Sequence, residues 1–368
     1  MKIYKQFDRS KIKYASLSER KNKVRIATDY IKVDTYAAVA DSTLLLRISQ
    51  IAKELKEARR VGASRMCVFG AHTIKNGLGP LLASFVKEGW FTHLATNGAG
   101  IIHDWEFSYL GESSEDVRCN VQKGRFGTWQ ETGLFINLAL VAGAYDGLGY
   151  GESVGRMITE DGFFIPSRTQ LEMDICNTQN PLSHRAAAAD FLDEIQSLGL
   201  KDGHFLSVKH PYKQYSIQAA CYQTGVPFTD HPMFGHDIIY THKASKGAAI
   251  GRVAEVDFLR YVASVKNLEH GVYLSIGSAV MSPMVFEKSL SMARNVLLQE
   301  GKDIRHAAIH VVDLQKESWD WSKGEPPMNN PAYYLRFMKT FSRMGCPVDY
   351  TSADNRDLLV LLYRELHK

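Results

Sequence analysis

The sequence predicts an α/β protein with a doubly wound, mostly parallel sheet that is covered by helices on both faces. Short apolar segments of the buried-strand type, such as 65–70, 92–96 and 271–276, alternate with longer segments whose apolar residues recur at helical spacing. Strand–helix–strand units of this kind imply parallel strand pairs joined by right-handed crossovers. A parallel sheet has both faces buried, which agrees with the nearly continuous apolar strands.

The composition is that of an ordinary globular protein. The 368 residues are 45% hydrophobic and 23% charged, and the net charge of +4 comes from 44 basic and 40 acidic residues spread along the chain. This excess is too small to indicate a nucleic-acid partner. No apolar run is long enough for a membrane span, and the charged N-terminus lacks a signal core. The five scattered cysteines form no CxxC pair, so we expect reduced thiols in a cytoplasmic protein.

The chain is predicted to consist of a short arm and one large domain, and the first half of that domain contains an insertion. Residues 1–35 are polar and mixed and predict an N-terminal arm, and 36–368 predict a single α/β domain with an irregular insertion at about 107–182. A helix over 36–60, a strand over 65–70, a helix over 78–88 and a strand over 92–96 give the first parallel pair. In the insertion we expect an apolar helix near 131–144. The glycines at 143–155 predict a loop, because no strand–GxGxxG–helix context surrounds them.

The second half resumes the alternation. A polar loop is expected at 229–244, between the second and third of the remaining helices. The predicted helices cover 185–198, 213–224, 254–265, 283–298, 331–343 and 355–366, and the predicted strands cover 204–208, 226–228, 271–276, 307–312 and 347–350.

Several predicted strands end in small or polar residues. Ligands of open α/β sheets bind at the carboxyl ends of strands, and glycines there let a ligand approach the backbone. An acidic residue after a strand, such as Asp313, is suited to ribose hydroxyls. The alternative for each glycine is a simple turn. We therefore predict a Rossmann-like dinucleotide site whose candidate residues are Ala71, His72, Thr96, Asn97, Gly98, Gly100, Gly277, Ser278 and Asp313.

Two further segments carry candidate catalytic residues. His103 beside Asp104 is a potential general acid/base pair, and the alternative is a capping Asp104 with a surface His103. Trp319 and Trp321 precede Lys323 in a loop after a strand. A lysine packed against indoles loses hydration, which favours the neutral, nucleophilic amine that forms imines. The alternative is that the tryptophans fill the edge of the core and Lys323 is solvated.

The loop at 230–242 contains several potential metal ligands. His231, His236 and His242 lie there together with Asp230 and Asp237. Such residues can build a divalent site, but their spacing is not an established ligand pattern. We therefore expect no metal and interpret the segment as a hydrogen-bonding loop over the pocket, with a metal hydrolase as the alternative.

Several segments taken together resemble deoxyhypusine synthase. Residues 96–104, T-N-G-A-G-I-I-H-D, are similar to that family's T-T-A-G-G-V-E-E-D. The loop from Ala71, the turn at Gly277 and the strand at 308–315 occur in the same order as the family's S-N-L-I-S-S-G-L, G-G-G-V and A-V-Y-I-N-T-A-Q segments. The chain departs from the family where Ile102 and His103 replace two glutamates, and where residues 282–284 replace a histidine pair.

This resemblance implies a specific chemistry. Thr96, Asn97, Gly98, Ser278 and Asp313 would contact NAD, and Lys323 would carry a substrate fragment as an imine. The expected function is hydride removal from an amine-type small-molecule substrate, with possible group transfer through that imine and with proton movement by His103 and Asp104 beside Trp321. A homotetramer is expected by resemblance. The alternatives are a simple NAD-dependent dehydrogenase and a non-catalytic dinucleotide-binding protein.

Overall fold

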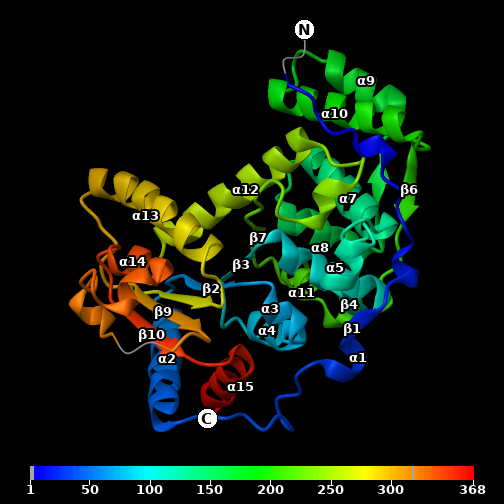
Figure 1. Cartoon of the computed structure of the whole chain (residues 1–368). Coiled ribbons are helices and arrows are strands. Elements are labelled where there is room, and N and C mark those ends of the chain that lie inside the picture. The colour runs from blue at the N-terminus through cyan, green and yellow to red at the C-terminus, as the bar shows by residue number, and fades with distance from the viewer. Residues whose placement is uncertain (1–3, 317–318) are drawn as a thin grey trace.

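The computed structural model describes residues 4–316 and 319–368, and its centre is a six-stranded parallel sheet (Figure 1). The strands lie in the order β10 (Val348–Ser352), β9 (Ala308–Asp313), β8 (Val272–Ile276), β2 (Arg65–Phe69), β3 (His93–Thr96) and β7 (Phe228–Asp230). All neighbouring pairs are parallel. Along the chain, the first strand of this sheet is β2, in the middle. The chain then runs outward through β3 to β7, returns to the middle at β8, and runs outward through β9 to β10. The predicted doubly wound α/β class is confirmed, and its switch point lies between β2 and β8.

Both faces of the sheet are buried because alternate strand residues point to opposite sides. Cys67 and Phe69 of β2 share one core with α2 (Ser42–Arg60), α4 (Gly79–Lys87) and α15 (Asn355–Leu366). Met66 and Val68 belong to a second core with α12 (Gly247–Lys266), α13 (Met281–Gln299) and α14 (Arg336–Ser342). The sheet is therefore the middle layer of three.

A largely helical lobe extends beyond the β3–β7 edge of the sheet (Figure 1). It contains α5 (Gly98–Leu110), α7 (Gln130–Asp146), α8 (Tyr150–Glu160), α10 (Leu182–Leu198) and α11 (Ile217–Thr224). Two small antiparallel pairs complete it, β1 (Asn22–Arg25) with β4 (Glu112–Glu115) and β5 (Gly162–Ile165) with β6 (His204–Ser207). The strand predicted at 204–208 is thus β6, outside the parallel sheet.

Two predictions about local structure are wrong for identifiable reasons. The segment after 96, for which no helix was predicted, is helix α5, which begins where the Asn97 side chain accepts a hydrogen bond from the Gly100 N–H. The loop expected over 143–155 is limited to residues 147–149, because α7 continues to Asp146 and α8 begins at Tyr150. Gly151 lies inside α8, and this position requires glycine because a Cβ there would lie 1.9 Å from the carbonyl oxygen of Phe228. Gly151 thus allows close packing of a helix, whereas Gly147, with φ +73°, forms the turn that ends α7.

The remaining elements are short or peripheral. No helix of the described ranges is long and apolar enough to cross a membrane. The other helices are α1 (Ile26–Asp29), α3 (His72–Lys75), α6 (Val117–Gln122) and α9 (Arg168–Cys176), and the 3-10 turns are η1 (Arg9–Lys11), η2 (Leu17–Glu19), η3 (Lys213–Tyr215), η4 (Ile238–Thr241), η5 (Trp321–Lys323) and η6 (Pro331–Tyr334).

Candidate functional site

The switch point between β2 and β8 forms a crevice at the carboxyl edge of the sheet. The Gly70 N–H donates to the carbonyl of Ile276 at 3.0 Å, so the two strands remain paired up to their ends. A Cβ at Gly70 would lie 2.2 Å from the carbonyl oxygen of Gly277, which requires glycine there. Gly277 has φ +56°, and no atom lies within 4 Å of the place where its Cβ would be. Its backbone therefore faces open space, at the position where open α/β sheets bind ligands.

The predicted cofactor residues divide into two groups. Ala71, His72, Asn97, Ser278 and Asp313 lie at the carboxyl edge with side chains that are exposed or partly exposed. The structure brings these five to the ends of the four neighbouring strands β3, β2, β8 and β9. They are therefore placed where one extended ligand could contact them.

Gly277 is exposed as well, whereas the remaining three predicted cofactor residues are covered. Thr96 is fully buried, and its hydroxyl donates to the carbonyl of Phe69 at 2.9 Å, so its side chain joins two strands instead of facing a ligand. A Cβ at Gly98 would lie 2.2 Å from Oδ2 of Asp237, and one at Gly100 would lie 2.2 Å from the Thr96 hydroxyl. Gly98 and Gly100 thus permit close packing at the start of α5.

A cavity of about 200 Å³ lies next to the amino end of α5. Its wall includes Lys75 of α3, His103 of α5, Ser114 of β4 and Asp237 of the 229–244 loop. Ser114 has φ +76°, a left-handed conformation that is uncommon for a residue other than glycine. Such strained residues are often found at functional sites.

The imidazole of His103 is held in one tautomer. The Ser113 hydroxyl has a single proton, which it donates to Oε2 of Glu106 at 2.6 Å. Its 2.7 Å contact with Nδ1 of His103 is therefore a bond that it accepts. Nδ1 carries the ring proton, and Nε2 keeps its lone pair. Burial lowers the pKa of His103 to about 4 and outweighs the opposing charge of Glu106, so the ring is neutral at pH 7.

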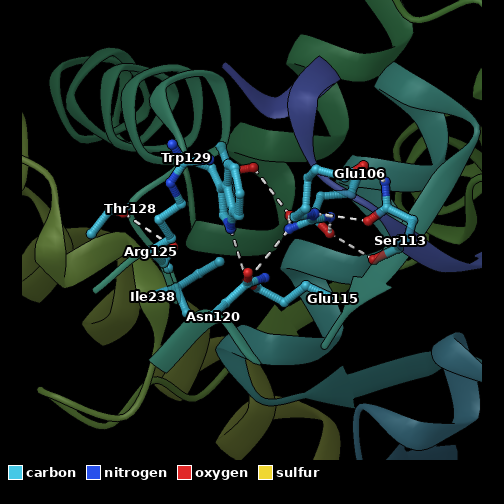
Figure 2. A network of polar contacts seen from close by, with 12 residues as sticks. Glu106, Ser113, Glu115, Asn120, Arg125, Thr128, Trp129 and Ile238 are labelled. Carbon is cyan, nitrogen blue, oxygen red and sulfur yellow. Dashed lines mark hydrogen bonds and ion pairs between the residues drawn. The ribbon is translucent and has the colours of Figure 1, made fainter. Parts of the chain in front are cut away.

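A buried ion pair supports this arrangement. Arg20, from the N-terminal arm, donates two hydrogen bonds to the Glu106 carboxylate, at 2.8 and 2.5 Å. Although burial alone would raise the pKa of Glu106, the charge and hydrogen bonds of Arg20 hold it below its ordinary value. Arg20 also lies 3.7 Å from Glu115, which accepts a hydrogen bond from the Trp129 indole at 2.9 Å, and Figure 2 shows Glu106, Ser113 and Glu115 in one polar network. The floor of the cavity is therefore rigid and charged.

Asp237 supplies an unpaired acid on the opposite side. Asp237 is 9% exposed, and its Oδ2 is buried without a hydrogen-bond partner. Burial raises the pKa of Asp237 to about 7. Behind it, both carboxyl oxygens of Asp230 and the hydroxyl of Tyr150 are also buried without partners. An acid of this kind can bind a cationic group from a ligand, because the protein itself leaves it unsatisfied.

Asp104 is not part of the cavity, which contradicts its predicted role in proton transfer. It is 1% exposed and accepts hydrogen bonds from the Ser216 hydroxyl and from the backbone N–H groups of Ile217 and Gln218. These groups form the amino end of α11, so Asp104 caps that helix. Neighbouring residues of a helix point about 100° apart, which separates Asp104 from His103.

Lys323 and Trp321 lie at the opposite edge of the sheet, beside the edge strand β10. The Lys323 side chain is 70% exposed, with its ammonium 3.6 Å from Asp320, and Trp321 is buried in the core that contains α14. Their turn, η5, packs against β10. β10 is four strand spacings from β3, roughly 19 Å. Within one chain, the structure therefore does not bring Lys323 and Trp321 together with His103.

The histidines of the 229–244 loop do not converge on one point. His231 contacts the hydroxyl of Thr229 at 3.2 Å, and burial lowers its pKa to about 3. His242 is fully buried and contacts Gln130 and the ring of Tyr14. His236 lines the cavity instead. The loop therefore covers the cavity, with each histidine in a different environment.

Arg20, Glu106, Ser113 and Lys75 were not predicted from the sequence as site residues. One signal was available, because Glu106 stands between two large apolar residues, Trp105 and Phe107. Such an acid is almost never buried unless it is paired. The partner, 86 residues away in the N-terminal arm, carries no comparable signal.

The fold and the crevice together define a class, that of Rossmann-like α/β proteins. No family model and no curated protein matches the sequence. Among solved structures, a conserved LOR/SDH protein from Methanococcus maripaludis S2 is similar at 15% identity and a TM-score of 0.45, over 90% of this chain and 72% of that one.

Two larger proteins are similar at the same level. AgrE, solved with ornithine and NAD+, shares 14% identity at a TM-score of 0.44, and ArgZ, an arginine dihydrolase from the ornithine-ammonia cycle in Cyanobacteria, shares 14% at 0.42. These matches cover 90% and 87% of this chain, but only 34% and 32% of AgrE and ArgZ. The chain spans about a third of their length.

These comparisons correct the predicted family. The similar structures are LOR/SDH, AgrE and ArgZ proteins, not deoxyhypusine synthases. The position of Lys323 gives the physical reason, since an imine on this exposed lysine would form at the β10 end of the sheet, away from the crevice and the cavity.

Proposed function

We propose that this chain is an NAD-dependent enzyme that oxidises a small substrate carrying an amino group, without a lysine imine. One observation carries the proposal. A cavity that contains a neutral imidazole, His103, and an unpaired carboxyl, Asp237, is also lined by Lys75 of α3, the helix that directly follows Gly70 and Ala71 of the crevice. Groups whose pKa values are shifted in a cleft are candidates for proton transfer.

The crevice supports NAD as the cofactor. The strand order is that of dinucleotide-binding sheets, in which the pyrophosphate lies outside the central strands. The backbones at 70–72 and 277–278 would approach the phosphates, and the carboxylate of Asp313 would accept hydrogen bonds from a ribose. The usual G-x-G-x-x-G sequence is absent, and Asn97 stands at the end of β3 where an acid is usual. The open space at Gly277 provides the close approach instead.

The cavity residues have complementary roles in this proposal. Bound NAD would accept a hydride from the carbon that bears the amino group. The Asp237 carboxylate would hold the substrate's ammonium group, and Nε2 of His103 would take a proton from it. Ser113 and Glu106 keep the proton of His103 on Nδ1 and are positioning residues.

The experiment combines a binding and a turnover measurement. NAD+ binding is measured by calorimetry, and NADH formation is followed by absorbance with a panel of amino compounds and matching alcohols. Ornithine and arginine, named for AgrE and ArgZ, are the first compounds to include. We expect NAD+ binding, turnover with amino compounds only, and loss of turnover in His103→Ala with NAD+ binding kept.

Three results would contradict the proposal in different ways. Absence of NAD+ and NADP+ binding would remove the cofactor. Turnover with alcohols alone would remove the amine substrate. Binding without any turnover would favour a non-catalytic dinucleotide-binding protein. Asp313→Ala tests the location of the NAD site, because this substitution should weaken NAD+ binding. Lys323→Ala, beside the edge strand β10, should leave NAD+ binding unchanged.

A further inference from the structure

Three potential metal ligands meet at the amino ends of the sheet strands, whereas the crevice lies at their carboxyl ends. Glu269 and His270 precede β8, and His306 precedes β9, so all three lie at the amino ends of these strands. One ligand atom from each lies within 4.8 Å of the other two. Within the described ranges, no other set of three histidine, cysteine, aspartate or glutamate side chains comes this close.

The carboxylate of Glu269 is oriented by the backbone. Its Oε2 accepts hydrogen bonds from the N–H groups of Arg305 and His306, at 2.6 and 3.0 Å. Its Oε1 lies 2.5 Å from Nδ1 of His306 and 3.8 Å from Nε2 of His270. One oxygen is therefore fixed and the other faces two imidazoles. Hydrogen bonds that orient a ligating carboxylate in this way are a regular feature of metal sites.

The conformation of His270 brings its ring to this point. His270 has φ +60°, in the left-handed region that residues other than glycine rarely adopt. Its ring lies parallel to that of His306, with an interplanar angle of 10° and centroids 5.4 Å apart. The neighbouring Arg305 guanidinium pairs with Asp303 at 2.6 Å, so it is directed to a carboxylate other than Glu269.

We propose that Glu269, His270 and His306 bind a divalent transition-metal ion of the Zn²⁺ type. Two imidazoles and one carboxylate are ligands that Zn²⁺ accepts readily, whereas Mg²⁺ and Ca²⁺ prefer oxygen ligands. Three protein ligands leave one position for water. The ion would join the loop that enters β8 to the loop that enters β9. The site is independent of the proposed enzyme function, because it lies at the opposite end of the strands.

The test is Zn²⁺ binding to the full-length chain. The protein is freed of any histidine tag, dialysed against a chelator and titrated with Zn²⁺ by calorimetry, and elemental analysis after gel filtration gives the stoichiometry. We expect one Zn²⁺ per chain, no comparable binding of Mg²⁺, and at least tenfold weaker Zn²⁺ binding in His270→Ala and in His306→Ala. Substitution of Co²⁺ should give the visible absorption of a nitrogen- and oxygen-ligated ion.

The matched control is His367→Ala. His367 is another exposed histidine beside a carboxylate, with Nε2 3.0 Å from Glu88, but it has one imidazole instead of two. Zn²⁺ binding should be unchanged in this variant. The His270 and His306 side chains are 63% and 69% exposed, so their variants should fold normally, which thermal unfolding without metal will verify. Glu269→Gln is a further variant and should also weaken binding.

Two outcomes would overturn the site. The first is that the wild-type chain binds no Zn²⁺ at tens of micromolar. The second is that His270→Ala and His306→Ala bind Zn²⁺ as tightly as His367→Ala does, which would locate the ion elsewhere.

Discussion

Replacing Asp237 by asparagine removes a carboxyl that is buried at the cavity with no partner for its Oδ2. Burial raises the pKa of Asp237 from 3.8 to about 7. A carboxyl whose pKa is raised by folding favours the folded state while it is protonated. This contribution to the free energy of unfolding is fully present below the unfolded-state pKa of 3.8, and it is lost as the pH rises to about 7. Wild-type stability should therefore fall between pH 4 and pH 7 because of this one group.

The magnitude follows from the size of the shift. About three pKa units at about 1.4 kcal/mol each give a cost of roughly 4 kcal/mol at pH 8, and about 2 kcal/mol at pH 5, where only the unfolded chain is ionised. Asparagine carries no such cost. Asp237→Asn should thus raise the free energy of unfolding by up to these amounts, with a larger gain at pH 8 than at pH 5.

The assay is urea unfolding followed by tryptophan fluorescence at pH 5 and pH 8. Comparison with the wild type cancels the other titrating groups. Asp34→Asn, at an exposed position, is the control and should change stability little at either pH. A gain in Asp237→Asn that does not increase from pH 5 to pH 8 would refute the reasoning. Under the proposed function, the stabilised variant should also lose turnover, since a costly buried acid is retained for use.

Three other substitutions test the remaining structure. Arg20→Met should lower the free energy of unfolding by about 3–5 kcal/mol in urea, because it leaves Glu106 buried without its cation. Gly70→Ala should cost about 1–3 kcal/mol and weaken NAD+ binding, because its Cβ meets the backbone of Gly277 after β8. Gly251→Ala, at a helical position with open space, is the control and should stabilise the protein by about 0.5–1 kcal/mol. Lys323→Ala should change stability by less than about 0.5 kcal/mol, and borohydride with NAD and an amine should trap no adduct on Lys323.

Much of the fold could be predicted from the sequence because burial is periodic. The buried strand at 65–69 and the final helix at 355–366 were predicted within a residue or two, since each has a pattern that only one element explains. Glycine was the main source of error. In α8, Gly151 allows contact with β7, and that requirement depends on a strand nearly eighty residues away.

The candidate site shows even more clearly the difference between what local sequence patterns predict and what depends on tertiary contacts. The sequence by itself determined the α/β class and the small and polar residues at the strand ends. Only the tertiary structure decided that Arg20 of the N-terminal arm reaches Glu106, that Asp237 lies against Gly98, and that Lys323 lies at the far edge of the sheet. The physical reason is that local patterns report which side of an element is buried, whereas the order of strands in the sheet decides which distant residues meet.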